Sequence, residues 1–383
     1  MHSRRTCVLF FLLLSLALCE QSHGQRMRTR TCVAFAPDGA LATGTVKTDE
    51  VEIKLKVSDA PVVTTHTSVP NSRSCEETFS NDGKWLATVV SGSELTVVIH
   101  DSKTGSIHKQ FSSEWRQVAH QPIEWSYESS FLGGFLPDDS LIVWRYVPRA
   151  VADPVDASHI DLHLQRWSIE GEMLSELDLG DLGFGVGGRH PIFANGLGLV
   201  WVPGRCASPC YKKIKISGAQ EAGFLNLPAD VATGPAFLPD NNGLLSILGQ
   251  RSIQKVALLD PTGRLQKQVT LPYFPNLLRP VVPDWFYVDG KEISRDGEIA
   301  AVARTRVAWV LVDTDRDWGS EIVLLKMQPL AVATVLKTGK GGIGTIAVDH
   351  RNGMVRLVGF WKERWHDMKY DEQHPGKWTE ANN

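Results

Sequence analysis

Thr78-Phe-Ser-Asn-Asp-Gly-Lys-Trp-Leu-Ala87 leads one apolar strand into a tight polar corner and out into a second apolar strand. Cys32-Val-Ala-Phe-Ala-Pro-Asp-Gly-Ala-Leu-Ala42 has the same form. Such corners recur at Pro37-Asp38-Gly39, Asn81-Asp82-Gly83, Pro137-Asp138-Asp139, Asn195-Gly196, Pro239-Asp240 with Gly243, Arg295-Asp296-Gly297 and Arg351-Asn352-Gly353. A spacing of roughly 45 to 57 residues is typical of propeller blades and too long for most helical solenoids. The repeat therefore predicts an all-β chain, a β-propeller of four-stranded antiparallel blades.

The second repeat contains all four strands of such a blade. Runs rich in apolar and β-branched residues cover 76–80, 85–90, 95–100 and 107–111, each bounded by turn residues, as short antiparallel strands require. Seven corners favour seven blades. Six blades remain the alternative, because the seventh repeat shows only two clear strands, at 343–348 and 354–361. Residues from the N-terminus could complete that blade and so remove its exposed edge.

These repeats resemble the WD40-like propeller superfamily. The two stretches quoted above are similar to the first half of a WD40 blade, and Thr96-Val-Val-Ile-His-Asp-Ser-Lys-Thr-Gly105 is similar to its second half. The likeness covers nearly all of the chain after residue 24. It departs from the family because no Trp-Asp dipeptide ends a third strand and no Gly-His dipeptide opens a blade. The resemblance implies a fold and leaves the partner open.

The first 24 residues have the features of a cleaved export signal. Arg4 and Arg5 precede an apolar run from Val8 to Leu18, and Ser22-His-Gly24 offers small residues for cleavage. Because this run of about eleven residues is too short to span a bilayer, we expect no transmembrane anchor and a secreted or periplasmic protein. A lipid anchor at Cys19 is a weaker alternative, since Leu18 stands where a small residue is needed.

The rest of the chain divides into two parts in this interpretation. Residues 25–361 form the propeller, and residues 362–383 form a polar tail that contains Trp365, Tyr370 and Trp378. We expect the tail to pack its aromatic side chains on the outside of the sheets, with a docking segment as the alternative. Without residues 1–24 the chain has 38 basic and 42 acidic side chains. It therefore lacks the basic surface that nucleic acid requires.

Four cysteines remain after the signal, and an even number in an oxidising compartment favours disulfides over a zinc site. Cys206 and Cys210 flank a short loop that could close on itself. Cys32 and Cys75 precede their corners by nearly the same offset, so we expect them at equivalent inner positions of neighbouring blades. Both pairs are predicted disulfides, and the second requires Cα atoms within about 7 Å.

One segment has the oxygen ligands of a calcium loop. Asp313, Asp315, Asp317 and Glu321 fall at positions 1, 3, 5 and 9, as in the calcium loops of integrin-type propellers. Trp318 stands where such loops have glycine, and Asp313 corresponds to the third-to-fourth strand turns at Asp101 and Asp260. We expect an ordinary turn and no cofactor, with a structural calcium ion as the alternative.

The long connections carry the residues most typical of binding surfaces. In a propeller the second-to-third loops and the blade crossings emerge on one face, and here they include the segments 112–128, 146–158, 203–211 and 272–287. Aromatic and arginine side chains are enriched at binding hot spots, and long loops on a rigid scaffold often carry function. The candidate binding residues are Trp115, Arg116, Trp125, Tyr146, Arg149, Arg205, Tyr273 and Trp285.

The sequence therefore favours a non-catalytic scaffold that binds a protein or glycan partner through its long loops. The alternative is a propeller enzyme of hydrolase or lactonase type, with Asp284, His190 and His120 near the mouth of the central channel. These residues form no recognisable catalytic motif, and general acid–base catalysis requires side chains that converge. Oligomeric state has no signal in the sequence.

Overall fold

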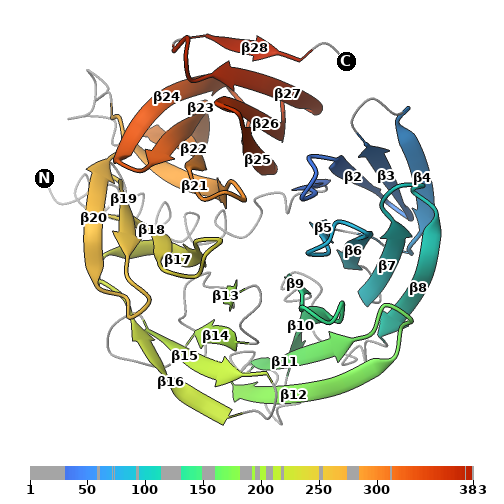
Figure 1. Ribbon diagram of the computed structural model, residues 1–383. Helices are drawn as coiled ribbons and strands as arrows, with labels where there is room; N and C mark the ends of the chain where they lie inside the picture. Colours follow the sequence, from blue (N-terminus) through green and yellow to red (C-terminus); the bar gives the residue numbers. More distant parts are fainter. Residues whose placement is uncertain are drawn as a thin grey trace, which may run out of the picture.

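The computed structural model describes residues 31–57, 61–70, 72, 74–91, 95–113, 131–148, 160–181, 192–194, 199–203, 210–216, 220–249, 253–273, 284–310, 313–375 and 377–381. These residues form seven four-stranded antiparallel sheets, arranged as blades around a central axis (Figure 1). The prediction of an all-β propeller with seven blades is confirmed.

Each blade is one contiguous stretch of chain whose strands pair in sequence order. Blade 1 contains β1 (Thr31–Phe35), β2 (Leu41–Lys47), β3 (Glu50–Lys56) and β4 (Val63–Ser68); blade 2 contains β5 (Ser74–Phe79), β6 (Trp85–Ser91), β7 (Leu95–Asp101) and β8 (Ile107–Ser113). Blade 3 contains β9 (Phe131–Phe135), β10 (Leu141–Pro148), β11 (Ile160–Trp167) and β12 (Met173–Asp181); blade 4 contains β13 (Ile192–Ala194), β14 (Leu199–Pro203), β15 (Cys210–Lys215) and β16 (Gln220–Asn226).

The last three blades follow the same order. Blade 5 contains β17 (Val231–Phe237), β18 (Leu244–Leu248), β19 (Lys255–Leu259) and β20 (Leu265–Thr270). Blade 6 contains β21 (Asp284–Ile293), β22 (Ile299–Val310), β23 (Asp313–Met327) and β24 (Leu330–Gly339). Blade 7 contains β25 (Ile346–Arg351), β26 (Met354–Trp361), β27 (Arg364–Asp371) and β28 (Trp378–Glu380).

The seventh blade corrects the expectation of a separate tail. Residues 364–371 and 378–380 are its third and fourth strands, so within the described residues no N-terminal strand completes it. The sequence pattern did not indicate strand β27, because its charged side chains alternate with the side chains that face the core. Tyr370, with only 2% of its surface exposed, packs in the apolar cluster between blades 6 and 7.

The repeated corners join the first and second strands of their blades. Gly39, Gly83, Gly297 and Gly353 take φ values of 89°, 75°, 74° and 74°, and Asp139 and Asn241 take 62° and 58° where glycine is absent. In five corners an aspartate Oδ1 accepts a hydrogen bond from the backbone N–H two residues later. Local turn chemistry therefore fixes where each blade reverses direction. The Asn195-Gly196 corner lies outside the described residues.

Replacing Gly83 by Val is expected to destabilise the protein by about 2 kcal/mol, because a β-branched residue tolerates positive φ poorly. The new Cβ would also lie 3.2 Å from Pro37 Cδ in the neighbouring corner. Urea unfolding measures the loss. Gly342→Val is the control, since a Cβ added at Gly342 would have no heavy atom within 4 Å and its φ is not positive. Equal unfolding midpoints for the two variants would contradict this account of the turn.

Apolar clusters fill the spaces between consecutive blades. Cys32, Val46 and Leu86 belong to the cluster between blades 1 and 2, which a disulfide between Cys32 and Cys75 also crosses, with a Cα–Cα distance of 5.5 Å. This predicted bridge is confirmed. Cys210 is disulfide-bonded as well. Cys206 lies outside the described residues, so its pairing stays a prediction.

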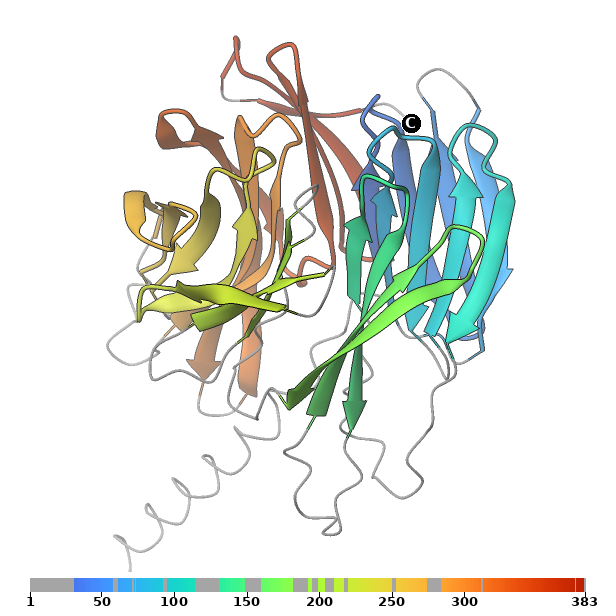
Figure 2. The same cartoon turned by 60° about the horizontal axis from the view of Figure 1, so that its bottom comes forward.

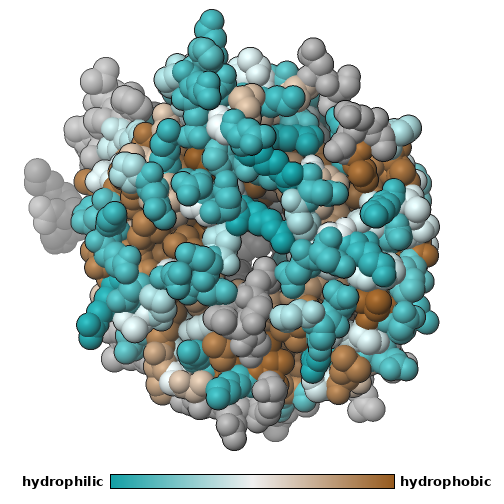
Figure 3. Space-filling view, in the orientation of Figure 1, coloured by the Kyte–Doolittle hydropathy of each residue, from teal (hydrophilic) through white to brown (hydrophobic). Residues whose placement is uncertain are grey.

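The two faces of the disc differ in their connections. The tight first-to-second strand corners lie on one face, here called the short-turn face, and Figure 1 looks onto it. Figure 2 turns these corners to the top. Figure 3 shows that the short-turn face is largely hydrophilic and hollowed at its centre. The opposite side, from which β21 begins and where β22 ends, is the long-loop face.

Candidate functional site

The structure describes few of the predicted binding residues. Trp115, Arg116, Trp125, Arg149 and Arg205 lie outside the described residues. Tyr146 lies in β10 and Trp285 in β21, and only their positions in these strands are described. Tyr273 directly follows blade 5, is partly buried and contacts aromatic and charged neighbours. Of the predicted binding residues, Tyr273 is therefore the one whose side-chain surroundings are described.

The centre of this site is a buried arginine. Arg304 of β22 has 1% of its side chain exposed and pairs with Glu321 of β23, with an Nε–Oε1 distance of 2.8 Å. Its Nη2 also donates to the carbonyl of Pro272. Burial lowers the pKa of Arg304 from its usual value, while the charge and hydrogen bond of Glu321 act against this. A buried guanidinium with matched acceptors is rigid, because leaving it unpaired would be costly.

Two aromatic rings lie between Arg304 and the protein surface. The Arg304 guanidinium lies over the Phe286 ring, 4.1 Å from its centroid. The rings of Phe286 and Tyr273 meet edge to face at 6.1 Å, and Arg306 lies 6.0 Å from the Tyr273 centroid. The four side chains thus form a row in which the rings of Phe286 and Tyr273 lie between the guanidinium groups of Arg304 and Arg306, an arrangement here called the Arg–aromatic ladder. Such contacts are attractive through the ring quadrupole.

Blades 5 and 6 position the ladder at their long-loop end. Alternate residues of β22 face opposite sides, and Ala300 and Val302 pack in the apolar cluster shared with blade 5. By the same alternation, Arg304 and Arg306 continue this row toward the long-loop face. Gln254 Nε2 donates to the Phe286 carbonyl at 3.0 Å and so ties blade 5 to the inner strand of blade 6. The strands β22 and β23, followed in Figure 2, are the longest in the described chain.

Sequence reasoning selected Tyr273 and Glu321 for different reasons, and the structure brings them together through Arg304. It missed Arg304 and Arg306. One signal was present: Ile299-Ala-Ala-Val-Ala reads as a fully buried strand, and Arg304 follows it directly. A charged residue in such a run requires a buried partner. The identity of that partner depends on strand register, which the sequence does not reveal.

The predicted calcium segment is not the expected turn. Residues 313–321 belong to β23, with Val307 opposite Asp317 and Arg304 opposite Glu321. The turn between the third and fourth strands of blade 6 instead follows Met327. Strand β22 continues to Val310, so the second and third strands are longer than the repeat spacing indicated.

Metal binding finds no support in the part of the chain that is described. No group of three or more His, Cys, Asp or Glu side chains there could hold an ion. Glu321 already accepts hydrogen bonds from Arg304. The side chains of Asp313, Asp315 and Asp317 are not among those described, so a calcium ion at this segment stays a prediction.

The inner strands bear on the enzyme alternative. Lys291 Nζ lies 3.3 Å from Thr233 Oγ1 and links β21 to β17. Desolvation by the protein lowers the pKa of Lys291 to about 8 and raises the pKa of Glu292 to about 7. The charge of Glu292 opposes the shift of Lys291, and the charge of Lys291 opposes the shift of Glu292. Glu292 is nevertheless exposed to solvent. The side chain of Asp284 and all of His190 and His120 lie outside the described residues, so the enzyme alternative is not tested at these residues.

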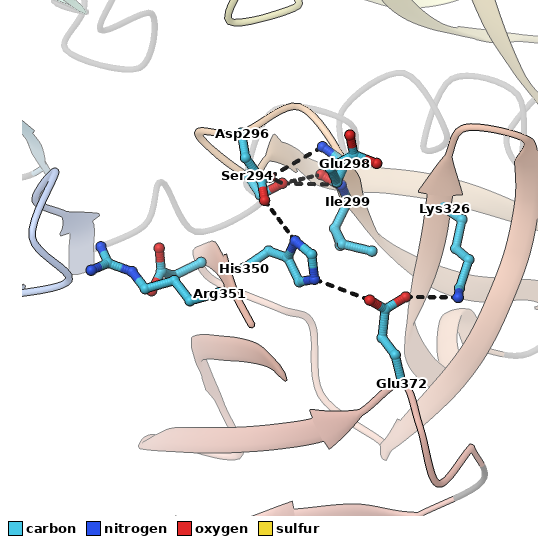
Figure 4. Close-up of polar contacts among 9 residues, drawn as sticks. Ser294, Asp296, Glu298, Ile299, Lys326, His350, Arg351 and Glu372 are labelled. Carbon is cyan, nitrogen blue, oxygen red and sulfur yellow. Dashed lines mark hydrogen bonds and ion pairs between the residues drawn. The ribbon is translucent and has the colours of Figure 1, made fainter. Parts of the chain in front are cut away.

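A second polar cluster, on the short-turn face, contains the residue types of a hydrolytic triad (Figure 4). His350 Nδ1 lies 2.6 Å from Asp296 Oδ2, and its Nε2 lies 3.0 Å from Glu372 Oε2. Ser294 donates to Asp296, and Lys326 Nζ lies 2.8 Å from Glu372. Both ring nitrogens of His350 face carboxylates, so neither is available to activate a hydroxyl. The cluster ties blade 6 to blade 7.

The carboxylates of this cluster are held in their charged form. Burial opposes ionisation of Asp296, but hydrogen bonds from Ser294, the Glu298 N–H and His350 outweigh it and lower the pKa of Asp296. Burial likewise opposes ionisation of Glu372, and the hydrogen bond and charge of Lys326 lower its pKa on balance. Charge-assisted hydrogen bonds of this kind are stronger than neutral ones.

The mouth of the central opening is crossed on the same face. Arg295 Nη2 donates to the Asn81 carbonyl at 3.0 Å. The two residues belong to the corners of blades 6 and 2, which stand across the ring from each other (Figure 1). The side chain of Arg295 therefore reaches over the hollow seen in Figure 3.

Comparison with known proteins bears on the fold. No protein-family model matches the sequence, and a search of curated proteins finds no significant relative.

None of the described segments is a helix long and apolar enough to cross a membrane.

Two solved structures with a similar fold are the C-terminal WD40 domain of Sif2 and the β-propeller domain of Myceliophteria thermophila Cps50 (Swd1). Each has a TM-score of 0.52 and 13% sequence identity. The first alignment covers 92% of this chain and 98% of the Sif2 domain, and the second covers 89% and 96%. At this identity the likeness concerns architecture alone. The chain is a seven-bladed propeller of the WD40-like fold.

Proposed function

We propose that the chain is an exported, non-catalytic propeller scaffold that binds a protein or glycan partner through its long-loop face. The observation that carries the proposal is the Arg–aromatic ladder at the junction of blades 5 and 6. Its outer members, Tyr273 and Arg306, are partly exposed, whereas its inner members, Phe286 and Arg304, are buried. A partner would therefore meet an arginine and a tyrosine supported from below.

Rigidity makes this surface suitable for binding. Arg304 is held by Glu321 and the Pro272 carbonyl, and it holds Phe286 in turn. Side chains that are already ordered lose less entropy when a partner binds. Tyr and Arg are also the residue types that carry most binding energy at interfaces, and both suit stacking on sugar or peptide planes.

Export is the second part of the proposal. Residues 1–24 have the pattern of a cleaved signal, and the Cys32–Cys75 disulfide suits an oxidising compartment. The destination is secreted or periplasmic. Mass spectrometry of the protein purified from its culture medium or periplasm tests this point, with Gln25 expected as the first residue. An intact N-terminus in cytosolic extract would contradict export.

Binding is tested by screening the purified protein against a glycan array and a panel of purified extracellular proteins. For any ligand found, Tyr273→Ala and Arg306→Ala are each expected to raise the Kd at least about tenfold, because truncation at a hot spot costs at least about 1.4 kcal/mol. Biolayer interferometry measures the Kd, and thermal unfolding confirms that each variant folds.

The matched controls are Lys84→Ala, in the first-to-second strand corner of blade 2, and Lys103→Ala, in the adjacent third-to-fourth strand turn on the same face. These variants are expected to bind as the unmodified protein does. A ligand whose affinity falls with the Lys84 or Lys103 variants, and stays unchanged with those of Tyr273 and Arg306, would place binding on the wrong face for this proposal.

A further inference from the structure

The interface between blades 7 and 1, where the ring closes, differs from the other six. Apolar clusters of buried residues fill the interfaces 1/2, 2/3, 3/4, 4/5, 5/6 and 6/7. The smallest of these, between blades 3 and 4, still contains eight buried residues. Among the described residues no such cluster joins blade 7 to blade 1. The two blades lie side by side in both ribbon views (Figures 1 and 2).

Strand alternation shows which side chains face this interface. In β2, Ala42 and Val46 pack toward blade 2, so Leu41, Thr43 and Thr45 face blade 7. In β26, Val355, Leu357 and Trp361 pack toward blade 6, so Arg356, Val358 and Phe360 face blade 1. The residues turned toward the closure are thus a mixture of threonine, arginine and apolar side chains that form no separate cluster.

Several polar contacts cross this interface. Arg351 Nη2 donates to the carbonyls of Pro37 and Ala36 at 3.0 and 3.4 Å. Trp365 Nε1 donates to Thr45 Oγ1 at 3.4 Å. Each of these groups can exchange its partner for water at small net cost when the blades separate.

Arg356 occupies the middle of the interface. Its guanidinium lies 5.4 Å from the centroid of the Phe35 ring in blade 1, and its Nη2 lies 2.7 Å from Asp367 Oδ2 within blade 7. Val358 is buried there with 2% of its surface exposed, yet it belongs to none of the apolar clusters. The cation–ring contact crosses the interface, while the ion pair stays within one blade and survives separation.

Both blades are held firmly on their other sides. Blade 1 is joined to blade 2 by the Cys32–Cys75 disulfide and an apolar cluster. Blade 7 is joined to blade 6 by a cluster that includes Leu357 and by the hydrogen bond between His350 and Asp296. Separating either of these pairs would expose apolar surface to water, which opposes opening in proportion to the area exposed.

We propose that the ring opens and closes at the interface of blades 7 and 1 under native conditions, while the other six interfaces stay closed. The fold thereby contains a lateral gate, since separation of β1 from β25 would give access to the central channel from the side of the disc. No strand has to leave its sheet, because each blade is contiguous in the chain. The proposal is independent of the partner proposed above.

Two buried valines of one strand provide the test. Val355 and Val358 of β26 are 0% and 2% exposed, and they face blade 6 and blade 1 respectively. Val355→Cys and Val358→Cys are the same chemical change on opposite faces of one blade. Alkylation by iodoacetamide in the full-length protein is followed at each site by peptide mass spectrometry, which separates the new thiols from the native cysteines.

Local opening predicts that Cys at position 358 is alkylated at least about tenfold faster than Cys at position 355, with a weak dependence on urea. Adding Arg356→Gln should accelerate alkylation at 358 further and leave 355 unchanged. If Val358→Cys alters the near-ultraviolet circular dichroism, Ala347→Cys in β25 replaces it, since Ala347 is buried on the same face. Equal rates at the two faces, or rates at 358 that follow global unfolding, would overturn the proposal.

Discussion

Arg304→Met is expected to destabilise the protein by about 3–5 kcal/mol, the usual cost of removing one partner of a buried ion pair. The substitution leaves the Glu321 carboxylate, with 14% of its side chain exposed, without its guanidinium. It also removes a donor from the Pro272 carbonyl and the cation above Phe286. Urea unfolding followed by tryptophan fluorescence measures the loss.

Two further variants show whether burial causes this loss. Arg166→Met removes the ion pair with Asp138, whose side chains are 30% and 56% exposed, so it should cost at most about 1 kcal/mol. Arg304→Met combined with Glu321→Leu should recover most of the stability, because no buried charge is then left unpaired. A single Arg304→Met variant as stable as the Arg166 variant would refute the account of the ladder as a rigid unit.

Glu77→Met is expected to stabilise the protein at pH 7.5 by about 2–3 kcal/mol, since a buried polar group without a hydrogen bond is costly. Both carboxyl oxygens of Glu77 are buried and have no hydrogen-bond partner. They lie beside the disulfide: a Cβ built on Gly44 would be 2.4 Å from Cys32 Sγ and 2.8 Å from Glu77 Oε1. Burial raises the pKa of Glu77 well above its usual value of 4.5.

The raised pKa sets the direction of the pH dependence. Above pH 4.5 the unfolded chain releases the Glu77 proton while the native state retains it, so raising the pH favours unfolding. The contribution of Glu77 is fully present below pH 4.5, falls as pH rises to its folded pKa, and is constant above that. The difference in unfolding free energy between Glu77→Met and the unmodified protein should therefore grow from pH 4.5 upward.

Guanidinium unfolding at several values between pH 4.5 and 8.5 measures this difference. The exposed turn carboxylate Glu172 serves as control, and Glu172→Gln should follow the unmodified protein at every pH. Parallel curves for Glu77→Met and the unmodified protein would show that Glu77 gains no proton affinity on folding.

The parts of the fold that depend on local chemistry could be predicted from the sequence. The corner at Asn81-Asp82-Gly83 requires positive φ and an aspartate acceptor, and both are encoded within three residues. The Cys32–Cys75 bridge was also predictable, because nearly equal offsets from two corners place both cysteines on inner strands. Such features need no knowledge of how distant strands pair.

The parts that depend on distant pairing could not. Strand β27, Arg364–Asp371, is so charged that only its antiparallel pairing with β26 identifies it as a strand. The ladder requires Arg304 to meet Glu321 across one strand pair and Phe286 across another. Neither strand register can be predicted from the sequences of the paired strands. A shift of one position would turn each side chain to the other face of the sheet.

The closure of the ring without an exchanged strand bears on how such a chain can be rearranged. Every sheet is encoded by one uninterrupted segment, from residues 31–68 for blade 1 to residues 346–380 for blade 7. A circular permutant that starts at blade 2 and ends with blade 1 would therefore encode the same seven sheets, with Cys32 and Cys75 still on adjacent blades. For the same reason a whole blade could be duplicated or deleted as one segment of the gene, because each blade is one contiguous segment of the chain.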